Sequence, residues 1–260
     1  MINMFTKNSI QKIFNFFGYS VTKIILLTFD NIYKRFFNKE QELVIFDIGA
    51  NKGQSIDRFL KLFPKASIHA FEPVKLEFLF LQKKFLKNKN IYLNNFAVGD
   101  VIEKKKFNVS VKTGVSSFYN FNKDTKWLRQ RSKEYKINKN EFINNVEDVN
   151  VVTLDHYCKK NNINNIDVLK IDVQGYEEKV LAGSKEILGR NIIKIIESEI
   201  MFDDVYEKSL SFTDLEKYLL KNFKFSAIKL YNNNLFEGLN FFAEVMYIRK
   251  NLIKKNYNHD

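Results

Sequence analysis

The stretch VIFDIGANKGQ, residues 44–54, decides the fold expected for this chain. An apolar run stops at Asp47 and is followed at once by Gly-x-Asn-x-Gly. That pattern indicates a buried strand that enters a tight turn and then a helix. Further along, AFEP at residues 70–73 ends a second short apolar run at the lone carboxylate of Glu72. Such a pair is typical of an α/β sheet that binds a nucleoside-containing ligand.

The chemistry of the turn follows from its residue types. Gly49 and Gly53 carry no Cβ, so the backbone can adopt unusual angles and a ligand can approach it closely. A helix that starts near Gly53 offers unpaired N–H groups and a positive dipole end, which suit a carboxylate or another anion. Glu72 can accept hydrogen bonds from both hydroxyls of a ribose, and bonds to a charged acceptor contribute about 1.5–3 kcal/mol each.

The kind of nucleoside ligand depends on the spacing of the glycines and on Asp47. A dinucleotide fingerprint is Gly-x-Gly-x-x-Gly, which binds a pyrophosphate. Here the spacing is Gly-x-x-x-Gly, and Asp47 would repel a pyrophosphate. S-adenosylmethionine has no phosphate and carries a sulfonium and an ammonium, so electrostatics favours this cofactor.

Composition sets outer limits on function. At 260 residues the chain suits one domain with appendages, and Lys+Arg 42 against Asp+Glu 30 gives a net charge of +12. This charge permits a nucleic acid, an anionic membrane or an acidic glycan as partner, although a lysine-rich coding bias explains it equally well.

Cysteine usage and the first residues point to a reducing, cytoplasmic setting. The single cysteine, Cys158, excludes an internal disulfide and a cysteine-rich zinc site. No complete set of metal ligands accompanies Asp203 and Asp204, so no metal is expected. We see no signal peptide, and the longest apolar run near the start, residues 24–27, is too short to span a bilayer.

The chain divides into three parts. Residues 1–40 form an amphipathic helical segment, which either packs on the main domain or makes peripheral contact with the inner face of a membrane. Residues 41–250 form the main domain, and residues 251–260 form a basic tail. A polar, basic stretch at 119–148 is either a lid, a substrate-selecting loop or a solvated excursion.

Strand and helix patterns alternate through the main domain and predict a mostly parallel sheet covered by helices on both faces. The last two strands read as an antiparallel hairpin, and a further hairpin is expected at 104–112. The predicted strands are 43–48, 67–72, 91–98, 149–153, 166–172, 192–199, 224–231 and 240–249. The predicted helices are 53–63, 74–87, 155–161, 176–188 and 211–222.

Five motifs occur in a fixed order along the chain: FDIGANKG (46–53), AFEP (70–73), NFAVGD (95–100), VTLD (152–155) and LKIDVQGYE (169–177). Together they resemble the FkbM family of S-adenosylmethionine-dependent methyltransferases from about residue 43 to 230. The resemblance implies a Rossmann-like class I methyltransferase fold with a seven-stranded sheet. It also implies O-methylation of a hydroxyl, on a polyketide or on a sugar of a surface glycan.

The resemblance further implies which residues bind the cofactor. Four residues of the first turn would face its methionine half, namely Asp47, Gly49, Asn51 and Gly53. Glu72 would bind the ribose, and the adenine would lie beside Asn95, Ala97 and Val98. A serine position near the cofactor corresponds to Ser116 and Ser117. This chain departs from many relatives in having Gln174 where they have Glu, which removes a carboxylate from that position.

Two residues are candidates for the catalytic base. Asp172 follows the fourth strand, where open α/β sheets place reacting groups, although it can also cap the next helix. His156 is the second candidate, beside an Asp155 that can equally serve as a helix cap. His69 lies inside a predicted strand, so we expect it to be structural. Cytosine-C5 methyltransferases use a cysteine that follows a proline, whereas Cys158 follows Tyr157, so we expect Cys158 to be structural as well.

The sequence therefore predicts a cytoplasmic O-methyltransferase that acts on a sugar hydroxyl of a surface glycan or glycolipid precursor. The alternative within enzymes is an O-methyltransferase of a small molecule or polyketide. A nucleic-acid-binding methyltransferase is less favoured. Enzymes that methylate amino groups of DNA carry an Asp/Asn-Pro-Pro-aromatic box, and this chain has none because Pro64 and Pro73 are its only prolines. The last alternative is a non-catalytic scaffold that binds the cofactor, because Gln174 removes a carboxylate that could have taken part in catalysis.

Overall fold

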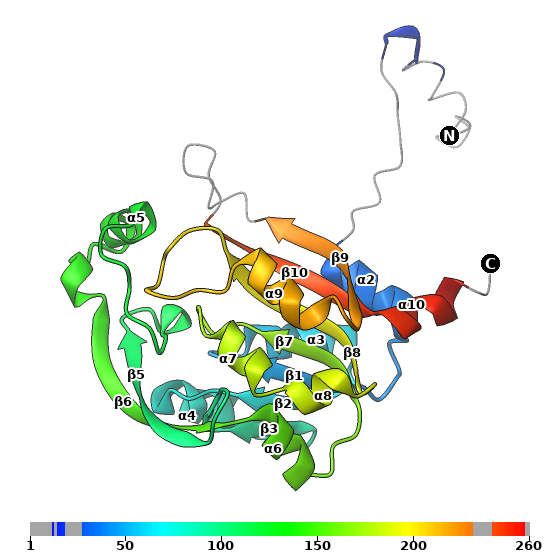
Figure 1. Ribbon diagram of the computed structural model, residues 1–260, viewed down its shortest axis with the longest axis horizontal. Coiled ribbons are helices and arrows are strands. Elements are labelled where there is room, and N and C mark those ends of the chain that lie inside the picture. The colour runs from blue at the N-terminus through cyan, green and yellow to red at the C-terminus, as the bar shows by residue number, and fades with distance from the viewer. Residues whose placement is uncertain (1–11, 13–14, 19–27, 231–240, 258–260) are drawn as a thin grey trace, which may run out of the picture.

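The computed structural model describes residues 12, 15–18, 28–230 and 241–257, in which strands and helices alternate (Figure 1). The central sheet has seven strands in the order β3-β2-β1-β7-β8-β10-β9. The first five are parallel, and β10 runs antiparallel between β8 and β9. This confirms the mostly parallel sheet with antiparallel C-terminal strands. The strands are β1 (Val44–Ile48), β2 (Ser67–Phe71), β3 (Ile91–Asn94), β7 (Ile166–Ile171), β8 (Ile193–Met201), β9 (Phe223–Leu230) and β10 (Phe242–Arg249).

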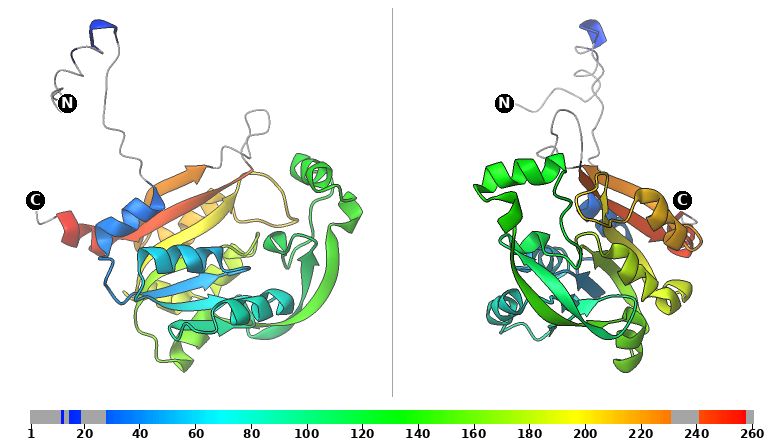
Figure 2. Two further views of the ribbon diagram at one scale, coloured as in Figure 1. Left: turned by 180° about the vertical axis from the view of Figure 1, so that it is seen from behind. Right: turned by 60° about the vertical axis from the view of Figure 1, so that its left-hand side comes forward.

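Helices cover both faces of this sheet, which is why its central strands are almost continuously apolar. In β1, Phe46 and Ile48 pack into the core on one face and Ile45 packs into the core on the other. The first face is covered by α6 (Leu154–Lys160), α7 (Glu177–Ala182), α8 (Lys185–Gly189) and α9 (Phe212–Leu219). The second is covered by α2 (Phe29–Phe36), α3 (Gln54–Leu62), α4 (Lys75–Lys84) and α10 (Lys250–Tyr257) (Figure 2).

A second sheet of three strands, in the order β4-β6-β5, stands beside the carboxyl ends of the first (Figure 1). Its strands are β4 (Ala97–Val98), β5 (Glu103–Ser110) and β6 (Ile143–Val152). The predicted strand 91–98 is therefore two strands, and the predicted hairpin at 104–112 is wrong. Instead, β5 pairs along its length with β6, which begins six residues before the predicted start at 149. Phe107 and Val109 supply the apolar face of β5, and their partners lie too far along the chain for local patterns to reveal.

The predicted helix 176–188 is also two helices, α7 and α8, which are separated at Gly183. The backbone of Gly99 packs against this point so closely that a Cβ on Gly183 would lie 1.9 Å from the Gly99 carbonyl oxygen. The carboxylate of Asp155 accepts from the N–H groups of Glu186 and Ile187, at 2.9 and 3.0 Å, and so caps α8. The two-helix arrangement thus depends on a contact between segments distant in sequence.

Helix α2 belongs to the predicted amphipathic segment 1–40. Thr28 caps its N-terminus, and Phe29, Ile32 and Tyr33 are buried against the main domain. Most of the segment before Thr28 lies outside the described residues. At the other end, α10 continues directly from β10 through much of the predicted basic tail. Within the described part of the chain, no helix has the length and apolar character needed to cross a membrane.

Candidate active site

A cavity of about 370 Å³ lies at the carboxyl ends of the parallel strands. Its walls are formed by the turns after β1, β2 and β7 and by residues between Phe107 and Phe118 of the second sheet. One end of the cavity is mainly apolar, with the single carboxylate of Glu72. The other end is lined by charged side chains of both signs, from α3, β7 and β10.

The turn after β1 follows the geometry that the sequence predicts. Gly49 has φ of 87°, and a Cβ there would lie 1.9 Å from the carbonyl oxygen of Asp172. Any side chain at Gly49 would therefore push apart the ends of β1 and β7. Gly53 also has a positive φ, 77°, but a Cβ there would meet Phe85, at 2.7 Å, and not the cavity. The absence of a side chain at Gly53 thus allows Phe85 and Leu81 to pack on the turn.

Glu72 is held in place before any ligand is bound. Its carboxylate accepts from the N–H of Asn51 at 2.7 Å and from the N–H of Val74 at 2.8 Å. It is buried, and this burial raises its pKa to about 7 despite those two bonds, which favour the charged form. A carboxylate offers about four lone-pair sites, so two backbone donors leave room for two hydroxyl donors.

The wall near Glu72 is apolar and comes mostly from the second sheet. Ala97, Val98, Phe107 and Phe118 line it together with Val74. These side chains form an apolar slot beside the single carboxylate of Glu72.

Not every residue predicted near the adenine lies on this wall. Asn95 points away from it, and its amide donates to the carbonyl oxygens of Glu72 and Pro73 at 3.0 Å each. Ser116 lines the cavity, whereas Ser117 donates to the backbone carbonyl of Gln174 at 2.7 Å. Asn95 and Ser117 therefore hold the loops that form the cavity.

A short bridge connects the glycine turn to the opposite wall. The amide of Asn51 donates to the hydroxyl of Thr113 at 3.2 Å, and that hydroxyl donates to the carboxylate of Glu77 at 2.7 Å. Thr113 and Gly114 belong to a short 3-10 turn, η1 (Thr113–Val115), that faces the glycine turn. The segment 119–148 does not line this cavity. It packs around Trp127 and Phe142 in a separate aromatic cluster.

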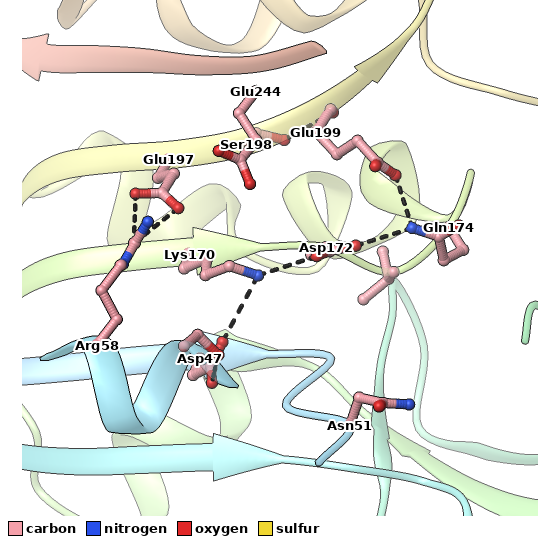
Figure 3. Close-up of polar contacts among 12 residues, drawn as sticks. Asp47, Asn51, Arg58, Lys170, Asp172, Gln174, Glu197, Ser198, Glu199 and Glu244 are labelled. Carbon is pink, nitrogen blue, oxygen red and sulfur yellow. Dashed lines mark hydrogen bonds and ion pairs between the residues drawn. The ribbon is translucent and has the colours of Figure 1, made fainter. Parts of the chain in front are cut away.

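The charged end is organised around the buried ammonium of Lys170 (Figure 3). Its Nζ lies 3.1 Å from the carboxylate of Asp172 and 3.8 Å from Oδ1 of Asp47. Burial favours the neutral form of Lys170, but Asp172 and Asp47 outweigh it and raise the pKa of Lys170. Ser55 donates to Oδ2 of Asp47. Among the described residues Oδ1 of Asp47 has no hydrogen-bond partner, and burial raises the pKa of this carboxyl.

Arg58 and Glu197 form the back of this end (Figure 3). The guanidinium of Arg58 contacts both oxygens of Glu197, at 2.7 and 2.8 Å, and the hydroxyl of Tyr33 donates to the same carboxylate at 2.6 Å. Arg58 and Glu244 line the cavity, whereas Glu197 is committed to these partners. Of the three glutamates Glu197, Glu199 and Glu244, it is Glu244 that lines the cavity.

Gln174 connects two carboxylates at the mouth of the charged end (Figure 3). Its amide nitrogen donates to Asp172 at 2.9 Å and to Glu199 at 2.8 Å, and Tyr206 donates to its carbonyl oxygen at 2.9 Å. Burial raises the pKa of Glu199, and the nearby Asp172 raises it further. A glutamate at position 174 would face two carboxylates, so the neutral amide of Gln174 suits this position.

The two candidate bases lie in different environments. Asp172 lines the cavity and its side chain is 35% exposed. His156 lies exposed on α6 and is not part of the cavity wall. His69 contacts the hydroxyl of Tyr157 at 2.8 Å, and burial lowers its pKa to about 4. Cys158 is buried, which raises its pKa to about 12.

The residues 47–227 match the methyltransferase FkbM domain, which covers more than half of the chain. This chain belongs to the FkbM methyltransferase family. It is an S-adenosylmethionine-dependent methyltransferase, and its sheet is that of the class I methyltransferase fold.

One curated relative and two solved structures are similar to this FkbM chain. The relative is the 2-O-methyltransferase NoeI of Sinorhizobium fredii, 29% identical over 169 residues, which are 64% of this chain and 67% of NoeI. The structure of methyltransferase FkbM from Methylobacillus flagellatus KT has a TM-score of 0.50 and 13% identity. That match covers 80% of this chain but only 44% of the other. Precorrin-6y C5,15-methyltransferase from Geobacter metallireducens has a TM-score of 0.42 and 11% identity, with coverage of 89% and 94%.

The residues of the cavity fit S-adenosylmethionine. The cations of Lys170 and Arg58 line the cavity and suit a carboxylate. Asp47, buried beside Lys170, has an Oδ1 without a hydrogen-bond partner among the described residues, which suits an ammonium. These charges of both signs match the zwitterionic amino-acid end of the cofactor, and the apolar slot beside Glu72 matches a nucleoside. Because S-adenosylmethionine has no phosphate, the cavity needs no phosphate-binding residues to hold it.

Several cavity residues of this FkbM enzyme lie outside the five sequence motifs. They are Arg58, Phe107, Thr113, Phe118 and Glu244. Lys170 lies within the motif at 169–177, in a buried strand whose other charged residue is Asp167. Arg58 lies on a surface helix, where a charged residue is ordinary, and its partner Glu197 is 139 residues away.

Proposed function

We propose that this FkbM enzyme methylates a hydroxyl of a sugar in a surface glycan or glycolipid precursor. The observation that carries the proposal is the Asp172 carboxylate, which is held at the cavity by Lys170 on one oxygen and Gln174 on the other. The acceptor class is supported by the relative NoeI, which is a 2-O-methyltransferase by name.

The two ends of the cavity define an orientation for the cofactor. We assign the ribose to Glu72 and the adenine to the slot between Val98 and Phe107. The amino-acid end then lies toward Lys170 and Asp47. In this orientation the middle of the cofactor lies beside Asp172. S-adenosylmethionine supplies a methyl group that is activated by the adjacent sulfonium.

Methyl transfer to oxygen is a displacement that asks little covalent chemistry of the protein. Alignment of the acceptor hydroxyl with the methyl group can supply about 7–11 kcal/mol of the barrier reduction. Asp172 accepts the hydroxyl proton as the oxygen attacks, and a positioned base contributes about 10²–10⁴-fold in rate. Lys170 and Gln174 hold the carboxylate so that it does not turn away.

A transfer assay tests the acceptor class. The enzyme is incubated with methyl-labelled S-adenosylmethionine and a panel of free and lipid-linked sugars. A matched analogue of each sugar has hydrogen in place of the 2-hydroxyl. We expect label in at least one sugar that has a free 2-hydroxyl, and no label in the matched analogue that lacks this 2-hydroxyl. Label only in polyketide-type hydroxyls, with every sugar unlabelled, would contradict the proposed acceptor.

A further inference from the structure

Helix α4 has apolar side chains on its outer face as well as on its inner face. Leu81 is fully buried against the sheet. On the outer face, Leu76, Leu79 and Phe80 are 70%, 49% and 47% exposed, and their spacing of three and four residues places them on one stripe. Leu86, just beyond the end of the helix, is 81% exposed. A helix packed on a core normally has a polar outer face, so this stripe is unusual.

The neighbouring helix α3 provides a control within the same molecule. It packs on the same face of the sheet, and its outward positions Gln54, Asp57 and Lys61 are polar and exposed. The outer stripe of α4 is therefore not a general consequence of a composition rich in Phe, Ile and Leu. It is a local property of residues 75–92.

Lysines surround the stripe almost without acidic neighbours. Five lysines lie between residues 73 and 99, and the one acidic residue there, Glu77, is buried. The five are Lys75, Lys83, Lys84, Lys87 and Lys89, all of them exposed. The acidic contacts from other elements are Asp57, which pairs with Lys84 at 2.6 Å, and Glu147, whose carboxylate accepts from the backbone N–H of Lys75 at 3.2 Å. The face thus combines exposed aliphatic side chains with a local excess of positive charge.

We propose that residues 75–92, the α4 surface, bind the surface of an anionic lipid bilayer. Helices of this composition insert apolar side chains at the level of the headgroups while lysines contact anionic lipids. A second copy of the chain would bring five lysines against five lysines, which repel each other. A nucleic acid would be bound through stacking on aromatic side chains, whereas the stripe is mostly leucine.

The α4 surface adjoins the cavity. Pro73 and Val74, which line the cavity, immediately precede α4, and Glu77 of α4 accepts from Thr113 of the cavity wall. A bilayer on this surface would hold lipid-linked acceptors beside the cavity. Membrane binding itself does not depend on the proposed acceptor.

Co-sedimentation of the full chain with vesicles tests the proposal. We expect binding to vesicles of phosphatidylglycerol and phosphatidylcholine in equal parts, and at least tenfold weaker binding to phosphatidylcholine alone. Combined substitution of Leu76, Leu79 and Phe80 by Ser should weaken binding to the mixed vesicles at least tenfold. Because these side chains are exposed, affinity for S-adenosylmethionine in calorimetry should stay within twofold, which also separates this test from that of the active site.

Two matched variants complete the design. Leu220→Ser with Ile228→Ser removes exposed apolar side chains from the C-terminal end of α9 and from β9, and it should bind vesicles within twofold of wild type. Phe16→Ser with Phe17→Ser tests whether the exposed phenylalanines of the N-terminal segment bind the vesicles instead. Wild-type protein that does not sediment with the mixed vesicles would overturn the proposal. So would wild-type binding by the triple variant, or loss of binding in the Phe16 and Phe17 variant alone.

Discussion

The two ends of the cavity are built in different ways. The end at Glu72 combines one carboxylate, fixed by two backbone N–H groups, with an apolar slot. The end at Lys170 is a network of side chains from distant strands and helices that balance one another's charges. The first end is suited to a neutral nucleoside, and the second is suited to a zwitterion and a proton transfer. Changes at Glu72 should therefore affect cofactor binding, whereas changes at Asp172 and Gln174 should affect turnover or the fold.

The largest expected effect is on turnover at the charged end. Asp172→Asn keeps the shape and loses the ability to accept a proton, so we expect turnover on the acceptor to fall by about 10²-fold or more. Affinity for S-adenosylmethionine should stay within about threefold by calorimetry. His156→Ala is the control, because that side chain is exposed and lies off the cavity, and its rate should equal that of wild type. A wild-type rate for Asp172→Asn would remove the proposed base.

At the other end, Glu72→Ala should act on binding. It removes the acceptor for both ribose hydroxyls, and each bond to a charged acceptor contributes about 1.5–3 kcal/mol, so affinity should fall at least tenfold. Glu72→Gln keeps the volume and should give an intermediate loss. Calorimetry of both variants measures the effect. An unchanged affinity in Glu72→Ala would refute the assignment of this end to the ribose.

These two ends also differ in how much the sequence predicted of them. The glycine turn, Glu72 and Asp172 lie at strand ends that local patterns identify, and the structure brings all three to one cavity. Phe107 and Phe118 were not predicted as cavity residues, because Phe107 is placed by the pairing of β5 with β6 and Phe118 packs on Phe107. Arg58 could not be predicted either, since its site depends on Glu197 in β8. Local sequence motifs thus predict the strand ends that border the cavity. The other cavity residues are brought there by contacts between segments that are distant in sequence.

Acid should weaken cofactor binding at the Glu72 end. The pKa of Glu72 is raised to about 7 by burial, so the free enzyme holds a proton there at pH 6 that must leave when ribose hydroxyls donate to the carboxylate. Affinity should thus fall by up to about tenfold from pH 8 to pH 6, following linkage. Calorimetry at the two pH values checks this, and Glu72→Gln should lose most of the dependence. Equal wild-type affinity at both values would contradict it.

A smaller effect, on stability, is expected from Gln174→Glu. The new carboxylate would replace the amide that donates to Asp172 and Glu199, at a cost of about 2 kcal/mol, or roughly 4–8 °C in Tm at pH 8. The pKa of Glu199 is already raised above its unfolded value, so the stability tied to it is present at low pH and is lost as pH rises. The variant should therefore regain stability at pH 5.5.

Gln82→Glu, an exposed substitution of the same kind on α4, is the control for this prediction. Its Tm should lie within about 1 °C of wild type, as is usual for surface changes. Thermal unfolding followed by circular dichroism at the two pH values measures both proteins. A Gln174→Glu variant with wild-type Tm at pH 8 would show that the amide is not needed to separate the two carboxylates.

The most direct test of the central claim is a crystal structure of the enzyme with S-adenosylhomocysteine, the product of the cofactor. We expect ribose hydroxyls within hydrogen-bond distance of Glu72 and the adenine between Val98 and Phe107. We also expect the amino-acid end beside Lys170 and Asp47. The reverse orientation, with the nucleoside at the charged end, or a product bound outside this cavity, would contradict it.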